Sequence, residues 1–192
     1  MKNARKVLLL VLCLVLVVSA TVMGTLAYLT DKTNEVKNTF TVGKVDIDLY
    51  ETKDGQHVVA NKYQLIPGAT YAKDPTVEVT DDSEDCYLFV KFEENNNAST
   101  YIKYTSNLTA ENGWNQVPGE TNVWYREVKK ADTTRSWKLL ADNEITINAN
   151  TVTNNSMNTA KDAELVYTAY ACQSAGLTLA DAWTQAQAQA NP

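Results

Sequence analysis

The sequence is poor in the residues that most enzymes use for catalysis, and histidine is the clearest case. His57 is the single histidine among 192 residues. A zinc peptidase of the His-Glu-x-x-His type needs two histidines on one helical face. A Ser-His-Asp or Cys-His centre would have to use His57, and no serine lies in a Gly-x-Ser-x-Gly turn. We therefore interpret His57 as a solvent-exposed loop histidine and expect no enzyme and no cofactor.

Glycine, proline and basic residues are also scarce. The chain has 7 glycines and 4 prolines against 10 tyrosines, which excludes collagen-like and low-complexity classes. Acidic residues outnumber basic ones by 23 to 17. Without a basic stripe to neutralise phosphates, the chain is not expected to bind nucleic acid.

The charge is divided unevenly along the chain. Residues 1–27 hold three basic residues and no acidic one, whereas residues 28–192 hold 14 basic and 23 acidic residues. Twelve unbroken apolar residues, 7–18, follow the basic start, which is the pattern of a secretory signal peptide. Small residues at 25 and 27 predict cleavage between Ala27 and Tyr28, which leaves residues 28–192 as a single secreted domain.

An uncleaved anchor is the alternative for the leader. The apolar stretch continues to Leu29 with a few small polar interruptions, which is long enough to span a bilayer. The acidic body is repelled by anionic membrane surfaces. We therefore expect membrane contact only through the leader, before its removal.

The body shows alternation of apolar and polar residues with a period of two, which is typical of half-buried antiparallel strands. The predicted strands are 44–51, 76–80, 86–93, 123–128, 137–140, 144–148 and 164–173. Residues 86–93 are apolar on both faces and are expected to be central. Residues 179–190 form the one clear helix of the prediction, anchored by Trp183. The polar stretch 93–120 is expected to be a surface loop with a short helix or turn. Many short strands with little helix indicate an all-β protein, an antiparallel β-sandwich with a short C-terminal helix.

Two segments near the start are distinctive, namely GTLAYLTD at residues 24–31 and NTFTVGKV at residues 38–45. They resemble the leader and first strand of the TasA/camelysin family. Weaker likenesses to the same family are found at residues 66–70, 73–77, 168–173 and 180–183. The resemblance implies a jelly-roll form of the sandwich and export from a Gram-positive bacterium. It also implies processing by a dedicated signal peptidase of the endoplasmic-reticulum type and assembly into extracellular fibres. Because camelysins have been classed as metallopeptidases, a secreted metallopeptidase is one alternative, which the single histidine opposes.

Cleavage after Ala27 would free a polar, extended segment joined directly to the first strand. Its apolar positions are Tyr28, Leu29, Val36 and Phe40. A mobile N-terminal strand can complete the sheet of a neighbouring copy, and such a head-to-tail contact grows fibres because it does not close. The segment 28–40 is therefore a candidate donor strand, and a frayed terminus is the alternative.

Two cysteines remain after the leader and Cys13 are removed. Cys86 and Cys172 lie in predicted core strands, and export is an oxidising route, so a disulfide between them is one interpretation. It would close a loop of roughly 87 residues and contribute about 4–5 kcal/mol in the chain-entropy description. Two buried thiols that behave as small apolar side chains are the other.

Acidic and aromatic clusters give two further candidate sites. Asp81, Asp82, Glu84 and Asp85 are a weak candidate for Ca²⁺, but they lack the spacing of an EF-hand loop and are more typical of a solvated charge run. Trp114, Trp124, Tyr125, Trp137 and Trp183 would suit glycan stacking if they shared one surface, whereas their strand spacing favours ordinary core packing.

The sequence as a whole indicates a structural protein of the cell surface or biofilm matrix whose work is self-association, alone or with related matrix subunits. A surface adhesin or binding module is the main alternative, with exposed aromatics or residues 93–120 contacting the ligand.

The leader interpretation predicts the N-terminus of the exported protein. Because small residues precede the Ala27–Tyr28 bond at both required positions, mass spectrometry of the secreted form should give a chain that begins at Tyr28. A chain that retains residues 1–27 would support the anchor instead.

Overall fold

The structure is a computed structural model that describes residues 44–190. Three predictions fall on residues outside those described. They are the signal peptide, its cleavage between Ala27 and Tyr28, and the candidate donor segment with Tyr28, Leu29, Val36 and Phe40. Within 44–190 the chain forms three antiparallel sheets with a few short helices, which confirms the predicted all-β class.

The first sheet has four strands in the order β2-β1-β4-β9. Its strands are β1 (Ile47–Lys53), β2 (Gln56–Val58), β4 (Thr76–Val79) and β9 (Ser136–Lys138). Asp54 and Gly55 join β1 to β2 with φ angles of 51° and 75°. Positive φ at both residues is what a tight two-residue hairpin requires, and Asp-Gly supplies it with little strain.

The second sheet has four strands in the order β11-β5-β8-β7. Its strands are β5 (Cys86–Asn95), β7 (Asn115–Gln116), β8 (Val123–Val128) and β11 (Glu164–Gln173). β5 pairs with β11 along all ten residues of both strands and with β8 on its other side. The predicted central position of residues 86–93 is confirmed.

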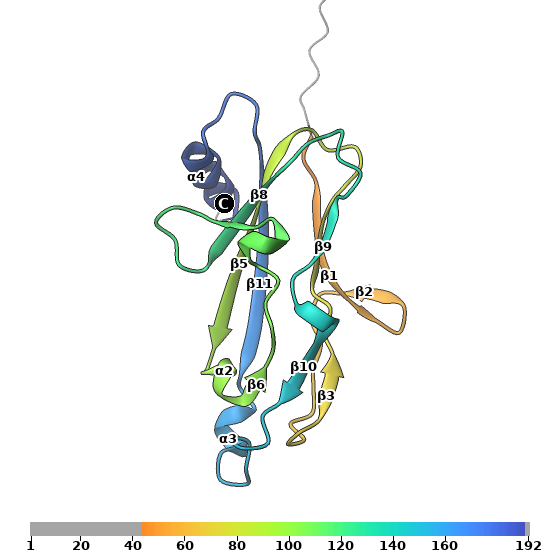
Figure 1. Ribbon diagram of the computed structural model, residues 1–192, viewed down its shortest axis with the longest axis vertical. Coiled ribbons are helices and arrows are strands. Elements are labelled where there is room, and N and C mark those ends of the chain that lie inside the picture. The colour runs from red at the N-terminus through yellow and green to blue at the C-terminus, as the bar shows by residue number, and fades with distance from the viewer. Residues whose placement is uncertain (1–43, 191–192) are drawn as a thin grey trace, which may run out of the picture. The chain divides into compact units, whose positions relative to one another are not determined.

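The third sheet is smaller and has the order β3-β10-β6. Its strands are β3 (Thr70–Ala72), β6 (Ile102–Lys103) and β10 (Glu144–Ile147). Short helices accompany these strands, namely α2 (Ala98–Tyr101), η1 (Ala110–Asn112), η2 (Ala141–Asn143) and α3 (Met157–Ala160). Figure 1 shows the third sheet, α2 and α3 at the lower end of the described chain.

The main hydrophobic core lies where the two four-stranded sheets face each other. Val77 and Val79 of β4 pack in one cluster with Leu88 and Val90 of β5, and Val128 of β8 joins them. All five side chains are fully buried. Within each strand the two residues of this cluster are two positions apart and therefore lie on the same face, so one face of β4 and one face of β5 share an apolar layer.

A second cluster covers the opposite face of the second sheet. Helix α4 (Leu179–Ala190) packs there through Trp183, whose ring lies 5.1 Å from the ring of Phe89 and 5.4 Å from that of Tyr170. The indole Nε1 of Trp183 donates a 3.0 Å hydrogen bond to Glu120. The predicted helix and its anchor are confirmed, and β5 is buried on both faces because α4 closes the second one (Figure 1).

Residues 93–120 contain short helices, α2 and η1, as expected, but they are not a surface loop. This stretch contains β6, η1 and β7, and it buries Trp114 to 1% exposure together with Leu108 and Val117. The guanidinium of Arg126 lies 4.6 Å from the Trp114 ring and 4.2 Å from the Trp137 ring, between the two indoles. Most side chains of this stretch face the solvent, which explains its polar composition. The few apolar side chains that face inward pack it against the core.

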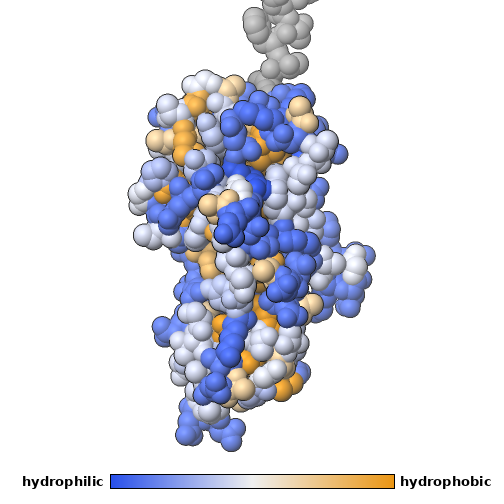
Figure 2. Space-filling model, viewed as in Figure 1, coloured by the Kyte–Doolittle hydropathy of each residue, from blue (hydrophilic) through white to orange (hydrophobic). Residues whose placement is uncertain are grey.

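Hydrophilic side chains cover most of the face seen in Figure 2, with small apolar areas between them. Among residues 44–190, no helix combines the length and the apolar character that crossing a bilayer demands.

We expect Trp183→Ala to lower the free energy of unfolding by about 3–5 kcal/mol, because it empties a large aromatic site against Phe89 and Tyr170. Trp183→Phe should lose much less, since the ring contact stays and only the hydrogen bond to Glu120 is removed. Urea denaturation measures both. Thr184→Ala, an exposed position on the same helix, is the control and should change stability by less than about 0.5 kcal/mol.

Candidate functional site

The longest unpaired strand edge of the described chain belongs to β11. Its ten residues pair with β5 on one side, and no strand among residues 44–190 pairs with the other side. The remaining sheet edges are short, since β2 and β9 have three residues each and β7 has two. A long edge with free backbone N–H and C=O groups is a template for another strand.

A groove of about 540 Å³ runs beside this edge. One wall is formed by the consecutive residues 163–167 of β11 and its preceding turn, and the other by residues 49–51 of β1. Successive side chains of a strand point to opposite faces of the sheet, so five consecutive residues cannot all line a groove through their side chains. The groove therefore runs along the backbone edge of β11. Leu49, Ile102, Ile145 and Leu165 give the groove an apolar floor.

A cluster of polar side chains centred on Glu51 lies in the same groove. Lys73 forms an ion pair with Glu51 Oε1, and the two side chains are only 9% and 11% exposed. Glu51 Oε2 accepts hydrogen bonds from Asn61 Nδ2 at 2.9 Å and from Tyr63 Oη at 3.0 Å. Lys73 Nζ also lies 5.6 Å from the centre of the Tyr63 ring. A carboxylate removed from water in this way is held by three donors at once.

Burial raises the pKa of Tyr63 and Tyr167 above the ordinary value of 10.0, and the negative charge of Glu51 adds to the effect in both cases. The Tyr63 hydroxyl has Glu51 as its partner. The buried hydroxyl of Tyr167 has no hydrogen-bond partner among the described residues, although its ring stacks on Phe92 at 4.7 Å. The groove therefore holds one unsatisfied polar group close to the open edge.

The two candidate disulfide cysteines are both free and buried. Cys86 is opposite Gln173 and Cys172 is opposite Tyr87 in the β5–β11 pairing, so the two cysteines are one residue out of register. Directly opposed residues share a face and adjacent residues alternate, which places the thiols on opposite faces of the sheet. Cys86 packs in the core between the sheets, and Cys172 packs under α4. The disulfide interpretation is therefore corrected to two separate buried thiols.

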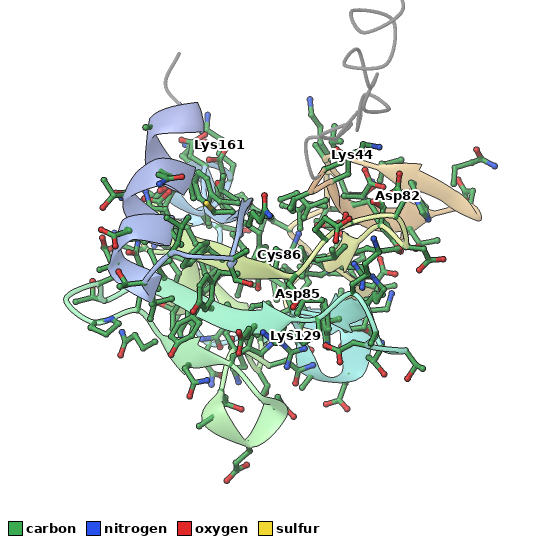
Figure 3. The ribbon with its side chains drawn as sticks, turned by 90° about the horizontal axis from the view of Figure 1, so that it is seen from above. Lys44, Asp82, Asp85, Cys86, Lys129 and Lys161 are labelled. Carbon is green, nitrogen blue, oxygen red and sulfur yellow. The ribbon has the colours of Figure 1, made fainter. Side chains whose placement is uncertain are left out.

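The acidic run does not assemble into a cation site in the described chain, where no group of three or more metal-binding side chains comes together. Asp82 faces Lys44 at 3.2 Å, Glu84 faces Lys130 at 2.7 Å, and Asp85 faces Lys129 at 3.7 Å. Figure 3 shows the pairs Asp82–Lys44 and Asp85–Lys129 at separate places. Asp81 is exposed. A hydrogen bond from Thr80 and the Lys44 pair lower the pKa of Asp82, so this carboxylate is already satisfied.

The other sequence candidates also serve packing. His57 is exposed on β2 and stacks on Tyr50 with ring centres 3.6 Å apart. Trp114 and Trp183 are buried in different clusters, and Trp124, Trp137 and Tyr125 are half-buried against them. The five aromatics therefore do not form one exposed platform.

Sequence reasoning missed the groove and its polar cluster. Glu51, Asn61 and Lys73 come from β1, from the connection after β2, and from the residue after β3. The sequence held one local indication of the cluster. Glu51 occupies an inward-facing position near the end of an alternating strand, where an apolar residue would be expected.

No family model matches the chain, and neither the curated proteins nor the solved structures include a match to it. The site is therefore interpreted from its own geometry.

We expect Cys86 and Cys172 to react when the protein is denatured without a reductant, because neither is bridged. In the native protein Cys86 should be inert at pH 8, since burial raises its pKa from 9.0 to about 11 and the thiolate is the reactive form. Titration with a chromogenic disulfide reagent measures both states. A denatured, unreduced sample without reactive thiols would restore the disulfide.

Tyr167→Phe should leave the free energy of unfolding at pH 7 unchanged or raise it by up to about 1 kcal/mol, because it removes a buried hydroxyl that has no partner. The folded-state pKa of Tyr167 is raised above 10.0, so above that pH the unfolded chain loses a proton that the folded chain keeps, and stability falls. The variant should lose less stability than the wild type as pH rises beyond 10. Urea denaturation at pH 7 and pH 10.5 measures the difference.

Tyr63→Phe is the matched control, because its hydroxyl does have a partner in Glu51. This variant should be destabilised at pH 7 by about 1–2 kcal/mol. Equal effects of the two substitutions at pH 7 would contradict the assignment.

Proposed function

We propose that this chain is a secreted structural protein of the cell surface or biofilm matrix, of the TasA/camelysin type, which assembles into fibres by donation of its N-terminal strand. The observation that carries the proposal is the ten-residue edge of β11, with which no strand of residues 44–190 pairs, beside a partly apolar groove. Most sheet edges in soluble proteins are shortened, charged or covered, and an uncovered long edge is where another strand adds.

The candidate donor segment fits the groove in length and character. The lining residues 163–167 span about 17 Å of strand, which a five-residue stretch such as 36–40 would cover. Val36 and Phe40 lie an even number of residues apart, so an extended chain directs both side chains to one face, toward the apolar floor. Its backbone would pair with the free edge of β11.

A contact of this kind uses different surfaces on the two copies. Donor residues 28–40 of one copy meet the β11 edge of the next, and the acceptor's own donor segment stays available for a third copy. Such an interface does not close and extends into a filament. The excess of acidic residues in 28–192 keeps unassembled chains apart through mutual repulsion.

The finer architecture of the proposal is a jelly-roll sandwich. Its support is the shared core between the two four-stranded sheets, to which β4, β5 and β8 contribute fully buried side chains. The added strand would lie beside β11 and extend the second sheet toward β1.

Removing the donor segment should prevent assembly. A mature chain without residues 28–37 should remain monomeric under conditions in which the chain beginning at Tyr28 forms fibres visible by electron microscopy. If the shortened chain polymerises like the full mature protein, strand donation by this segment is wrong. A full-length mature chain that stays monomeric and retains glycan or protein ligands would support the adhesin instead.

The acceptor edge is tested by Val166→Lys. Val166 lies on β11 opposite Glu93, so a lysine there meets an opposite charge within the monomer while it places a charge on the edge. We expect fibre growth, followed by light scattering, to slow at least about tenfold with little loss of stability. Thr133→Lys adds the same charge in the exposed β8–β9 connection and should assemble like the wild type. Equal growth rates for both variants would remove β11 as the acceptor.

A further inference from the structure

We propose that Lys73 and Asn61 form an intramolecular isopeptide bond, with Glu51 as the group that transfers the protons. The inference goes beyond fibre assembly and does not depend on it, because the bond would form within one folded chain. It rests on the arrangement of the three side chains in the groove beside β11.

The two reacting groups are held by the two oxygens of one carboxylate. The Nζ atom of Lys73 contacts Glu51 Oε1, and the Nδ2 atom of Asn61 donates a 2.9 Å hydrogen bond to Oε2. The amine and the amide are therefore fixed on adjacent sides of the same proton acceptor. Holding reactants together in this way replaces a slow encounter by a unimolecular step.

The surroundings keep water away from the reacting groups. Glu51 and Lys73 are each about nine-tenths buried, and apolar side chains such as Leu49 and Ile145 line the same groove. The Tyr63 hydroxyl, which donates to Glu51 Oε2, holds the carboxylate in place.

The step balances without an added reagent. Glu51 takes one proton from the ammonium of Lys73, and the neutral Nζ attacks Cγ of Asn61. A second proton of Nζ passes through Glu51 to Nδ2, the Cγ–Nδ2 bond breaks, and neutral ammonia leaves. The product is a secondary amide between Nζ and Cγ with Glu51 protonated, so no charge is left buried and nothing is oxidised or reduced.

The bond would fasten a segment that has little regular structure. Residues 59–69 connect β2 to β3 without a strand or helix of their own, and Val59 at the start of this connection is 95% exposed. Asn61 lies within the connection, and Lys73 immediately follows β3. A covalent link between them would fix this connection, which also lines the groove, relative to the sheets.

The test is the intact mass of the exported protein, measured on the denatured monomer after its N-terminus has been determined. We expect a mass about 17 Da below the value calculated from the sequence, which is the mass of ammonia. Lys73→Arg keeps the ion pair with Glu51 but removes the nucleophilic amine, and Glu51→Gln removes the proton acceptor, so both should show the full calculated mass. Circular dichroism establishes that each variant is folded.

Lys138→Arg is the matched control. Lys138 pairs with Asp74 at 2.8 Å in a more exposed position, with no asparagine amide on the same carboxylate among the bonds of the described chain. This variant should keep the full mass deficit of the wild type. It excludes a general effect of replacing an ion-paired lysine.

Tryptic mapping locates the bond. In the linked protein Lys73 is not cleaved, and peptide 54–62 should be found joined to peptide 63–91. Cyclisation of Asn61 on its own backbone also releases ammonia, but it would leave the deficit within peptide 54–62 and would survive Lys73→Arg. A wild-type protein at full mass, or a deficit that persists in Lys73→Arg, would overturn the proposal whatever the protein's assembly behaviour.

Discussion

The structure depends on the burial of β5 on both of its faces. Leu88 and Val90 point into the core between the two large sheets, while Phe89 points into the layer closed by α4. A shift of one residue in the pairing of this strand would exchange the two sets of side chains, so its register is fixed from both sides. Strands β11 and β8 both pair with β5, and α4 packs on the outer face of β5 and β11.

The open edge of β11 is a consequence of the same arrangement. Strand β5 needs a ten-residue partner on one side to satisfy its backbone groups, and that partner becomes an edge of equal length. The other edges of the large sheets are two or three residues long and leave few groups unpaired. An edge of this length can pair with another strand, and the groove beside it holds a buried ion pair, which is costly to desolvate.

Local patterns predicted much of the fold. Strands 123–128 and 164–173 and helix 179–190 coincide with the observed elements because each carries an uninterrupted periodicity between polar turns. The stretch 93–120 was misjudged because its buried residues, Trp114 among them, are separated by polar residues in irregular order. Burial of this kind is decided by partners such as Arg126 and Trp137, which lie far along the chain.

The candidate site could not be predicted from local sequence patterns for a similar reason. Which strand becomes an edge depends on the order of strands in the sheet, and the side chains around Glu51 come from three separate segments. The resemblance in the leader implied strand donation, but it did not indicate which strand would accept the donor. The edge of β11 and the polar cluster around Glu51 depend on tertiary contacts.

The two cysteines have a consequence for how the protein matures. The two cysteines lie on opposite faces of the paired strands β5 and β11, with Cys86 on the inner face and Cys172 on the outer one. Once the ladder has formed, no rotation of either side chain can bring the sulfur atoms together. The folded form of residues 44–190 therefore has no bond between these two sulfur atoms, and its formation needs neither an oxidase nor a disulfide isomerase.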